Sequence, residues 1–159
     1  MRQKEIAGWL KGITMVLAVM GLVFFLVLLP VLAAQFRDEL PEVSWLYWPG
    51  LLYGWGIGVV CFLILYQFWK VCVEIGRDNS FSMENAASFK HISRFALLLA
   101  LIWFAGIVFL ACSRMLWPGI LIFLLVAVLL SAIVSILAAA LSHLILKAYE
   151  LKKENELTI

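Results

Sequence analysis

Four long apolar blocks alternate with short polar segments along this chain. The blocks cover about residues 12–35, 50–70, 94–113 and 118–146. A helix needs roughly 20 apolar residues to cross a hydrocarbon core about 30 Å thick, and each block is close to or above that length. The pattern predicts an all-α, polytopic membrane protein, in which residues 1–159 form a single membrane domain built as a four-transmembrane-helix bundle.

The first block has two readings. The small residues that follow Val31 resemble a processing site, which would make residues 12–35 a cleavable signal peptide. The apolar run is longer than the 7–15 residues of a signal core, so we expect a spanning helix and no cleaved signal peptide. Pro30 is expected to bend or end this helix near its outer mouth, because proline cannot donate the backbone hydrogen bond.

Small residues recur every fourth position in two blocks. In the second block they are Gly50, Gly54 and Gly58. In the fourth block they continue into a weakly polar stripe: Ala127, Ser131, Ser135, Ala139 and His143. Small residues let neighbouring helices approach closely, so both stripes, including Ser131 and Ser135, are predicted to form helix-packing seams. A glycine-lined pore is the alternative for the second block.

Composition and charge agree with a membrane protein and give its orientation. Hydrophobic residues make up 65% of the chain, and its mean hydropathy is +1.07, against roughly 45–50% apolar residues in soluble domains. The net charge of +2 is too small to indicate direct nucleic-acid binding. Ten basic residues fall in the two ends and the central polar segment: Arg2, Lys4, Lys11, Lys70, Arg77, Lys90, Arg94, Lys147, Lys152 and Lys153. The other side has only Arg37 and Arg114, which predicts cytoplasmic N and C termini.

The residues that carry chemistry in membrane enzymes and transporters are sparse. The interiors of the apolar blocks contain no Asp, Glu, Lys or Arg, whereas proton relays and ion-coupled transporters usually retain such groups. The two histidines and three cysteines lack metal-ligand spacing. No serine or cysteine has an evident base and orienting group. We therefore expect no catalytic residues, no metal, no cofactor and no enzymatic activity.

The two cytoplasmic segments are the loop at 71–93 and the C-terminal tail at 147–159. Gly76 is expected to end the second helix, with turn residues after it. Ser82 stands where an N-cap belongs, so its hydroxyl should accept a hydrogen bond from the N–H of Asn85. The third helix would then run unbroken from Met83, and its first two or three turns would project into the cytoplasm.

Two motifs in these segments resemble a known family. One is the Gly-x-x-x-x-Phe-Ser-x-x-Asn pattern from Gly76 to Asn85, and the other is the Leu-Thr-Ile terminus at residues 157–159. They are similar to the signatures of the YoaS-like bacterial membrane proteins, catalogued as domain of unknown function 2975. Glu156 stands where the family more often has aspartate. The resemblance implies a protein of the bacterial inner membrane with no assigned enzymatic activity. Because neighbouring genes often encode a small helix-turn-helix regulator, it also implies a small DNA-binding protein as partner.

The leading hypothesis is a non-enzymatic membrane protein that anchors or sequesters a cytoplasmic partner. Its candidate partner-binding residues lie in the two motifs and the helix that follows the first: Asn79, Phe81, Ser82, Asn85, Phe89, Leu157, Thr158 and Ile159. Two alternatives stay open. One is a small transporter or channel subunit, and the other is a homo-oligomer that binds a lipophilic ligand. The lipid bilayer itself is a partner in every case.

Overall fold

The computed structural model describes the backbone of residues 3–157 and the side chains of residues 4–155. The described part of the chain is helical throughout, apart from short turns, and contains no strand. Its elements are α1 (Gln3–Val23), the π-helix η1 (Phe24–Leu28), α2 (Leu29–Glu39), the 3₁₀ helix η2 (Pro41–Leu46), α3 (Tyr47–Gly76), α4 (Met83–Cys112) and α5 (Pro118–Leu157). The all-α fold class predicted from the sequence is confirmed.

Four helical segments are long and apolar enough to cross a membrane. They comprise α1 with η1 and α2, η2 with α3, α4, and α5. Helix α5 has 40 residues, about 60 Å at 1.5 Å per residue, which is twice the thickness of the hydrocarbon core. The helices therefore extend beyond the apolar blocks, and a multi-pass membrane protein in contact with the bilayer follows from these lengths.

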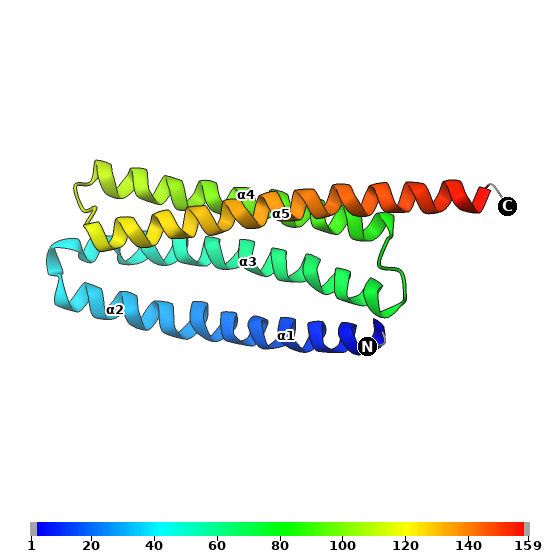
Figure 1. The fold of residues 1–159 in the computed structure, drawn as a ribbon. Helices are drawn as coiled ribbons and strands as arrows, with labels where there is room; N and C mark the ends of the chain where they lie inside the picture. Colours follow the sequence, from blue (N-terminus) through cyan, green and yellow to red (C-terminus); the bar gives the residue numbers. More distant parts are fainter. Residues whose placement is uncertain (1–2, 158–159) are drawn as a thin grey trace.

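The helices pack in the order α1, α3, α4, α5, each against its neighbours in that order (Figure 1). Over the described residues, the backbone of α1 does not approach α4 or α5, and that of α3 does not approach α5. The two termini and the α3–α4 turn lie at one end of the bundle, and the α2–η2 segment and the α4–α5 turn lie at the other (Figure 1). Helices α1 and α5 thus form the open edges of the bundle.

Proline 30 does not end the first span. The chain passes through η1 directly before it and continues as a helix to Glu39. A π-turn and a proline both leave helix carbonyls without their usual N–H partners. The indole Nε1–H of Trp55 in α3 donates to the carbonyl of Phe25 at 2.9 Å. A neighbouring helix thereby satisfies a backbone group that has no water to bind inside a bilayer.

Two of the three glycines in the predicted stripe of α3 lie in the seam with the first span. A Cβ atom at Gly54 would lie 2.5 Å from the side chain of Leu29, and one at Gly58 would lie 2.9 Å from the ring of Phe25. Gly50 is exposed and has open space around it. The close approach is therefore formed by Gly54 and Gly58, and Gly50 lies outside it.

The α3–α4 contact uses another glycine. The hydroxyl of Tyr53 donates to the carbonyl of Ile102 at 2.7 Å. A Cβ atom at Gly106 would lie 2.5 Å from that hydroxyl oxygen, so only glycine leaves room for the tyrosine. Sequence reasoning missed this pair, because a lone glycine in an apolar block does not reveal which side chain occupies the space beside it.

The α4–α5 seam contains both serines predicted to pack there, Ser131 and Ser135, and both are buried. A third serine, Ser142, also contributes a hydrogen bond. The hydroxyl of Ser135 donates to the carbonyl of Ser93 at 2.9 Å, and that of Ser142 donates to the carbonyl of Ala86 at 2.7 Å. Five described residues of α5 are buried. One is Ser135, and the other four recur every seventh position: Leu124, Ser131, Ala138 and Ile145. A seven-residue repeat stays on one helix face, whereas four-residue steps drift around it. The predicted continuation of the stripe through Ala139 and His143 is wrong, because both are exposed.

Candidate functional site

The turn between α3 and α4 is held by backbone hydrogen bonds. Helix α3 ends at Gly76, as expected, but the residue with the left-handed backbone is Asp78, at φ 62°. The N–H of Asn79 donates to the carbonyl of Glu74 at 3.0 Å, and the N–H of Asp78 donates to that of Ile75 at 3.1 Å. This pairing is the Schellman arrangement, which usually has glycine where Asp78 stands.

A carboxylate reinforces the end of α3. The side chain of Glu74 accepts from Nη1 of Arg77 at 3.0 Å and from Nδ2 of Asn79 at 2.9 Å. Its side chain is 16% exposed, whereas that of Arg77 is 70% exposed. The Asn79 amide is therefore directed back onto α3, which limits what it offers to a partner.

The start of α4 is capped as the sequence predicts. The N–H of Asn85 donates to Oγ of Ser82 at 3.1 Å, and Ser82 has the extended backbone of an N-cap residue. Nδ2 of Asn85 donates to the carbonyl of Ser80 at 2.9 Å. Ser82 is 2% exposed and Asn85 is 1% exposed, so both hold the turn from inside. Oδ1 of Asn85 is buried and accepts no hydrogen bond within the described part of the chain.

The turn presents apolar groups to its surroundings. The side chain of Phe81 is 58% exposed and that of Met83 is 52% exposed, while Phe89 is half-buried. Asn79 is exposed but engaged with Glu74. Among the candidate residues in the first motif, Phe81 is thus the one most open to contact, and Ser82 and Asn85 are structural.

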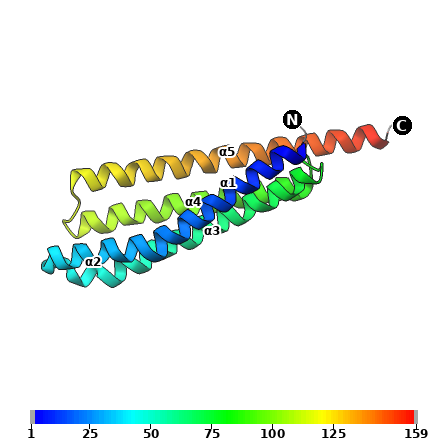
Figure 2. The ribbon, with the colours of Figure 1, turned by 90° about the horizontal axis from the view of Figure 1, so that it is seen from below.

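The end of α5 projects beyond the rest of the bundle. Figures 1 and 2 show its last turns extending past the α3–α4 turn. The hydrogen bond from Ser142 to the carbonyl of Ala86 joins α5 to α4, Ile145 is buried, and Ala148 and Tyr149 are still half-buried. Residues 150–155 are all exposed, and Leu151 is 60% exposed. Leu157 ends the helix, its side chain is outside the described set, and Thr158 and Ile159 lie outside the described residues.

A cleft of about 570 Å³ lies between α3 and α4 beside the turn. Charged groups of both signs line it, among them Lys70, Glu74 and Glu84, together with His91. The ammonium group of Lys70 lies 4.7 Å from the centre of the Tyr66 ring. The end of α3 next to the turn is therefore polar on this side, which suits a helix that emerges into lipid headgroups and water.

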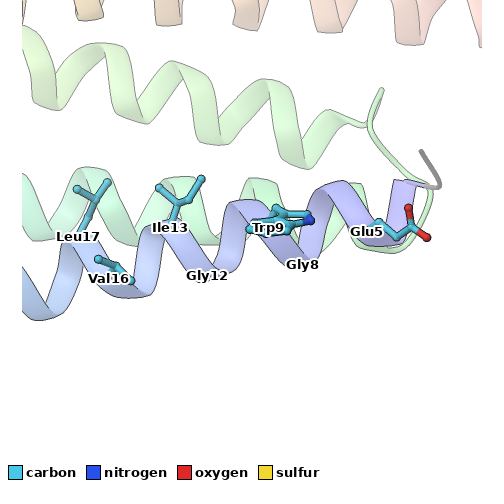
Figure 3. Close-up of a pocket in the computed structure, with 7 residues that line it drawn as sticks. All are labelled: Glu5, Gly8, Trp9, Gly12, Ile13, Val16 and Leu17. Carbon is cyan, nitrogen blue, oxygen red and sulfur yellow. The ribbon is translucent and has the colours of Figure 1, made fainter.

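The face of α1 that is not packed against α3 carries an open apolar groove (Figure 3). The groove runs over Gly8 and Gly12, where a Cβ atom would meet nothing within 4 Å, and Trp9 beside it is 71% exposed. The apolar 18-residue window of this span has no buried residue. In a bilayer this face contacts lipid chains, because no other described helix covers it.

Within the described residues, no three His, Cys, Asp or Glu side chains come close enough together to hold a metal ion. The three cysteines are unpaired thiols at different depths: Cys72 is buried, Cys61 is half-buried and Cys112 is exposed. Most polar groups brought together at the α3–α4 turn form hydrogen bonds with one another, and Oδ1 of Asn85 is the exception. The arrangement at the α3–α4 turn is a hydrogen-bonded helix cap with exposed apolar side chains, Phe81 and Met83, beside it.

The family model described as "Protein of unknown function (DUF2975)" matches residues 31–159. The chain belongs to this family. It is also similar to the uncharacterized membrane protein YoaS of Bacillus subtilis (strain 168), with 26% identity over 143 residues, which cover 89% of this chain and 88% of that protein. No solved structure matches the chain. The family resemblance carried by the two motifs, at residues 76–85 and 157–159, is confirmed.

Proposed function

We propose that this member of the family is a non-enzymatic protein of the bacterial inner membrane that holds a cytoplasmic protein at the membrane surface. The observation that carries the proposal is the end of α5, which continues as a helix through the exposed residues 150–155, past the buried Ile145 and the half-buried Tyr149. Both chain ends and the α3–α4 turn lie at this end of the bundle (Figure 1). The ten-to-two bias of basic residues supports a cytoplasmic position for it.

The projecting segment has the chemistry of a docking element. Helix α5 runs on to Leu157 beyond the half-buried Tyr149, and helices gain most of their stability in water from packing of an apolar face. A binding partner would stabilise this helix by covering apolar side chains such as Leu151. Lysines and glutamates around Leu151 would form the polar rim of such an interface.

The proposed partner is a small helix-turn-helix regulator, which the family resemblance implies. A DNA-binding protein held at the membrane would be kept from its operator or brought close to a membrane signal. Phe81 at the α3–α4 turn would add a second, apolar contact on the same side of the membrane.

Removing residues 148–159 is expected to abolish partner recovery without unfolding the membrane domain. The full chain, tagged at its N-terminus and purified from its native host, should recover a cytoplasmic protein. The shortened chain should recover at least about tenfold less, since hot-spot contacts at an interface contribute 1.4 kcal/mol or more. Quantitative mass spectrometry of the co-purified proteins measures this.

A matched control keeps the same residues in a scrambled order at positions 148–159, which preserves length and charge. It should behave like the shortened chain, while both variants elute from a sizing column in detergent as the native protein does. Equal recovery from the native and scrambled chains would contradict a specific docking element. So would the absence of any cytoplasmic protein from the native chain.

A further inference from the structure

A second cleft lies at the opposite end of the bundle from the termini. It has a volume of about 570 Å³ and is lined by residues of α2, η2 and the first turn of α3, and by the α4–α5 region. Its walls include the aromatic rings of Phe36, Tyr47 and Trp117 and the aliphatic side chains of Leu110 and Ile120. Pockets of about 300–1,000 Å³ with mainly apolar and aromatic walls are typical of small-molecule sites. The charge bias of the chain places this cleft at the outer surface of the membrane.

Two charged residues line the cleft, and one of them is already engaged. Nε of Arg37 donates to Oδ1 of Asp38 at 3.1 Å, and its guanidinium carbon lies 4.9 Å from the centre of the Tyr47 ring. The positive charge therefore has a carboxylate beside it and an aromatic ring against it, although this exposed ion pair leaves part of the charge open to solvent. The contact also shows that this ring accepts a cation on its face.

The second charged residue, Glu42, is free to act on a ligand. It lies in the first turn of η2, is exposed, and forms no ion pair with any described residue. Residues 37–42 carry one basic and three acidic side chains, so the segment that borders the cleft has an excess of negative charge. A carboxylate beside aromatic rings is the combination that recognises organic cations.

We propose that this outer cleft binds a hydrophobic organic cation that enters from the outer leaflet. Its apolar groups would occupy the space between Phe36, Leu110 and Ile120. Its charge would lie near Glu42 and the face of an aromatic ring such as Trp117. This site does not depend on the proposed cytoplasmic docking element, because the two lie at opposite ends of the bundle (Figure 1).

Tetraphenylphosphonium and tetraphenylborate test this proposal as a matched pair, because they share size and shape and differ in the sign of their charge. The full chain in a non-ionic detergent should bind the phosphonium cation at least about fivefold more tightly than the borate anion, with quenching of tryptophan fluorescence and titration calorimetry as readouts. Stronger binding of the borate would overturn the proposal and would assign the cleft to an anion held by Arg37.

Two variants locate the site. Glu42→Gln should weaken phosphonium binding about fivefold, whereas Glu39→Gln, in the same segment but outside the cleft lining, should leave it unchanged. Trp117→Leu keeps an apolar wall and should weaken binding about threefold, because the ring face is lost. Unchanged binding in both Glu42→Gln and Trp117→Leu would overturn the proposal, and so would an equal loss in Glu39→Gln and Glu42→Gln.

Discussion

Replacing Gly58 with leucine is expected to destabilise the folded protein by about 2–3 kcal/mol, the usual cost of overpacking a close seam. A Cβ atom at this position would lie 2.9–3.1 Å from Cγ, Cδ1 and Cδ2 of Phe25, the part of the ring nearest to its backbone. Those atoms cannot swing aside as the tip of a long side chain would. The α1–α3 seam must therefore separate to admit the leucine.

Gly56→Leu is the matched control for this prediction. Gly56 lies in the same helix, is exposed, and has open space where its Cβ atom would stand. The Gly56→Leu protein should unfold at or slightly above the unfolding temperature of the native protein, because leucine favours helix more than glycine does. Thermal unfolding in detergent, followed by circular dichroism, measures both variants. If the two leucine variants lose equal stability, Gly58 does not form the seam.

Replacing Trp55 with phenylalanine is expected to cost about 1–3 kcal/mol, the usual penalty for leaving a buried hydrogen-bonding group without its partner. The indole N–H of Trp55 donates to the carbonyl of Phe25, inside the π-helix that precedes Pro30. Phenylalanine keeps an aromatic ring but has no donor, and the hydrocarbon around this position supplies none. The loss should appear as a lower midpoint of unfolding in the same melting experiment.

Trp48→Phe provides the comparison for the Trp55 variant. The ring of Trp48 is 65% exposed, and its indole N–H donates no hydrogen bond to another described residue. Its replacement should change stability by less than about 0.5 kcal/mol, as surface substitutions usually do. If the Trp55→Phe and Trp48→Phe proteins unfold at the same temperature, the carbonyl of Phe25 does not need the indole N–H of Trp55.

Local rules explain why so much of the fold was predictable. Four apolar blocks of membrane-spanning length predict four helices, Ser82 marks the start of α4, and Pro118 marks the start of α5. Contacts between residues far apart in the sequence were not predictable from such local rules. The partner of Trp55 is a carbonyl 30 residues earlier in the chain, and no local pattern encodes that distance.

The candidate site was likewise predictable only where a local rule applies. The N-cap role of Ser82 follows from its position and residue type, and the structure confirms it. The sequence does not show that Asn85 turns inward to the carbonyl of Ser80, which makes it part of the turn and not of an exposed surface. The outer cleft combines residues from two distant stretches of the chain, 33–47 and 110–120, so periodicity within one helix does not reveal it.

Both proposed sites depend on the direction in which the chain crosses the membrane. Cys112 is exposed at the end of α4 opposite to the termini, and Glu150 is exposed in the projecting end of α5. A membrane-impermeant maleimide should label the native chain in intact spheroplasts, and Cys112→Ser should abolish that labelling. A cysteine placed at position 150 in the Cys112→Ser background should be labelled only after the membrane is opened. Labelling at position 150 in intact spheroplasts would contradict cytoplasmic docking.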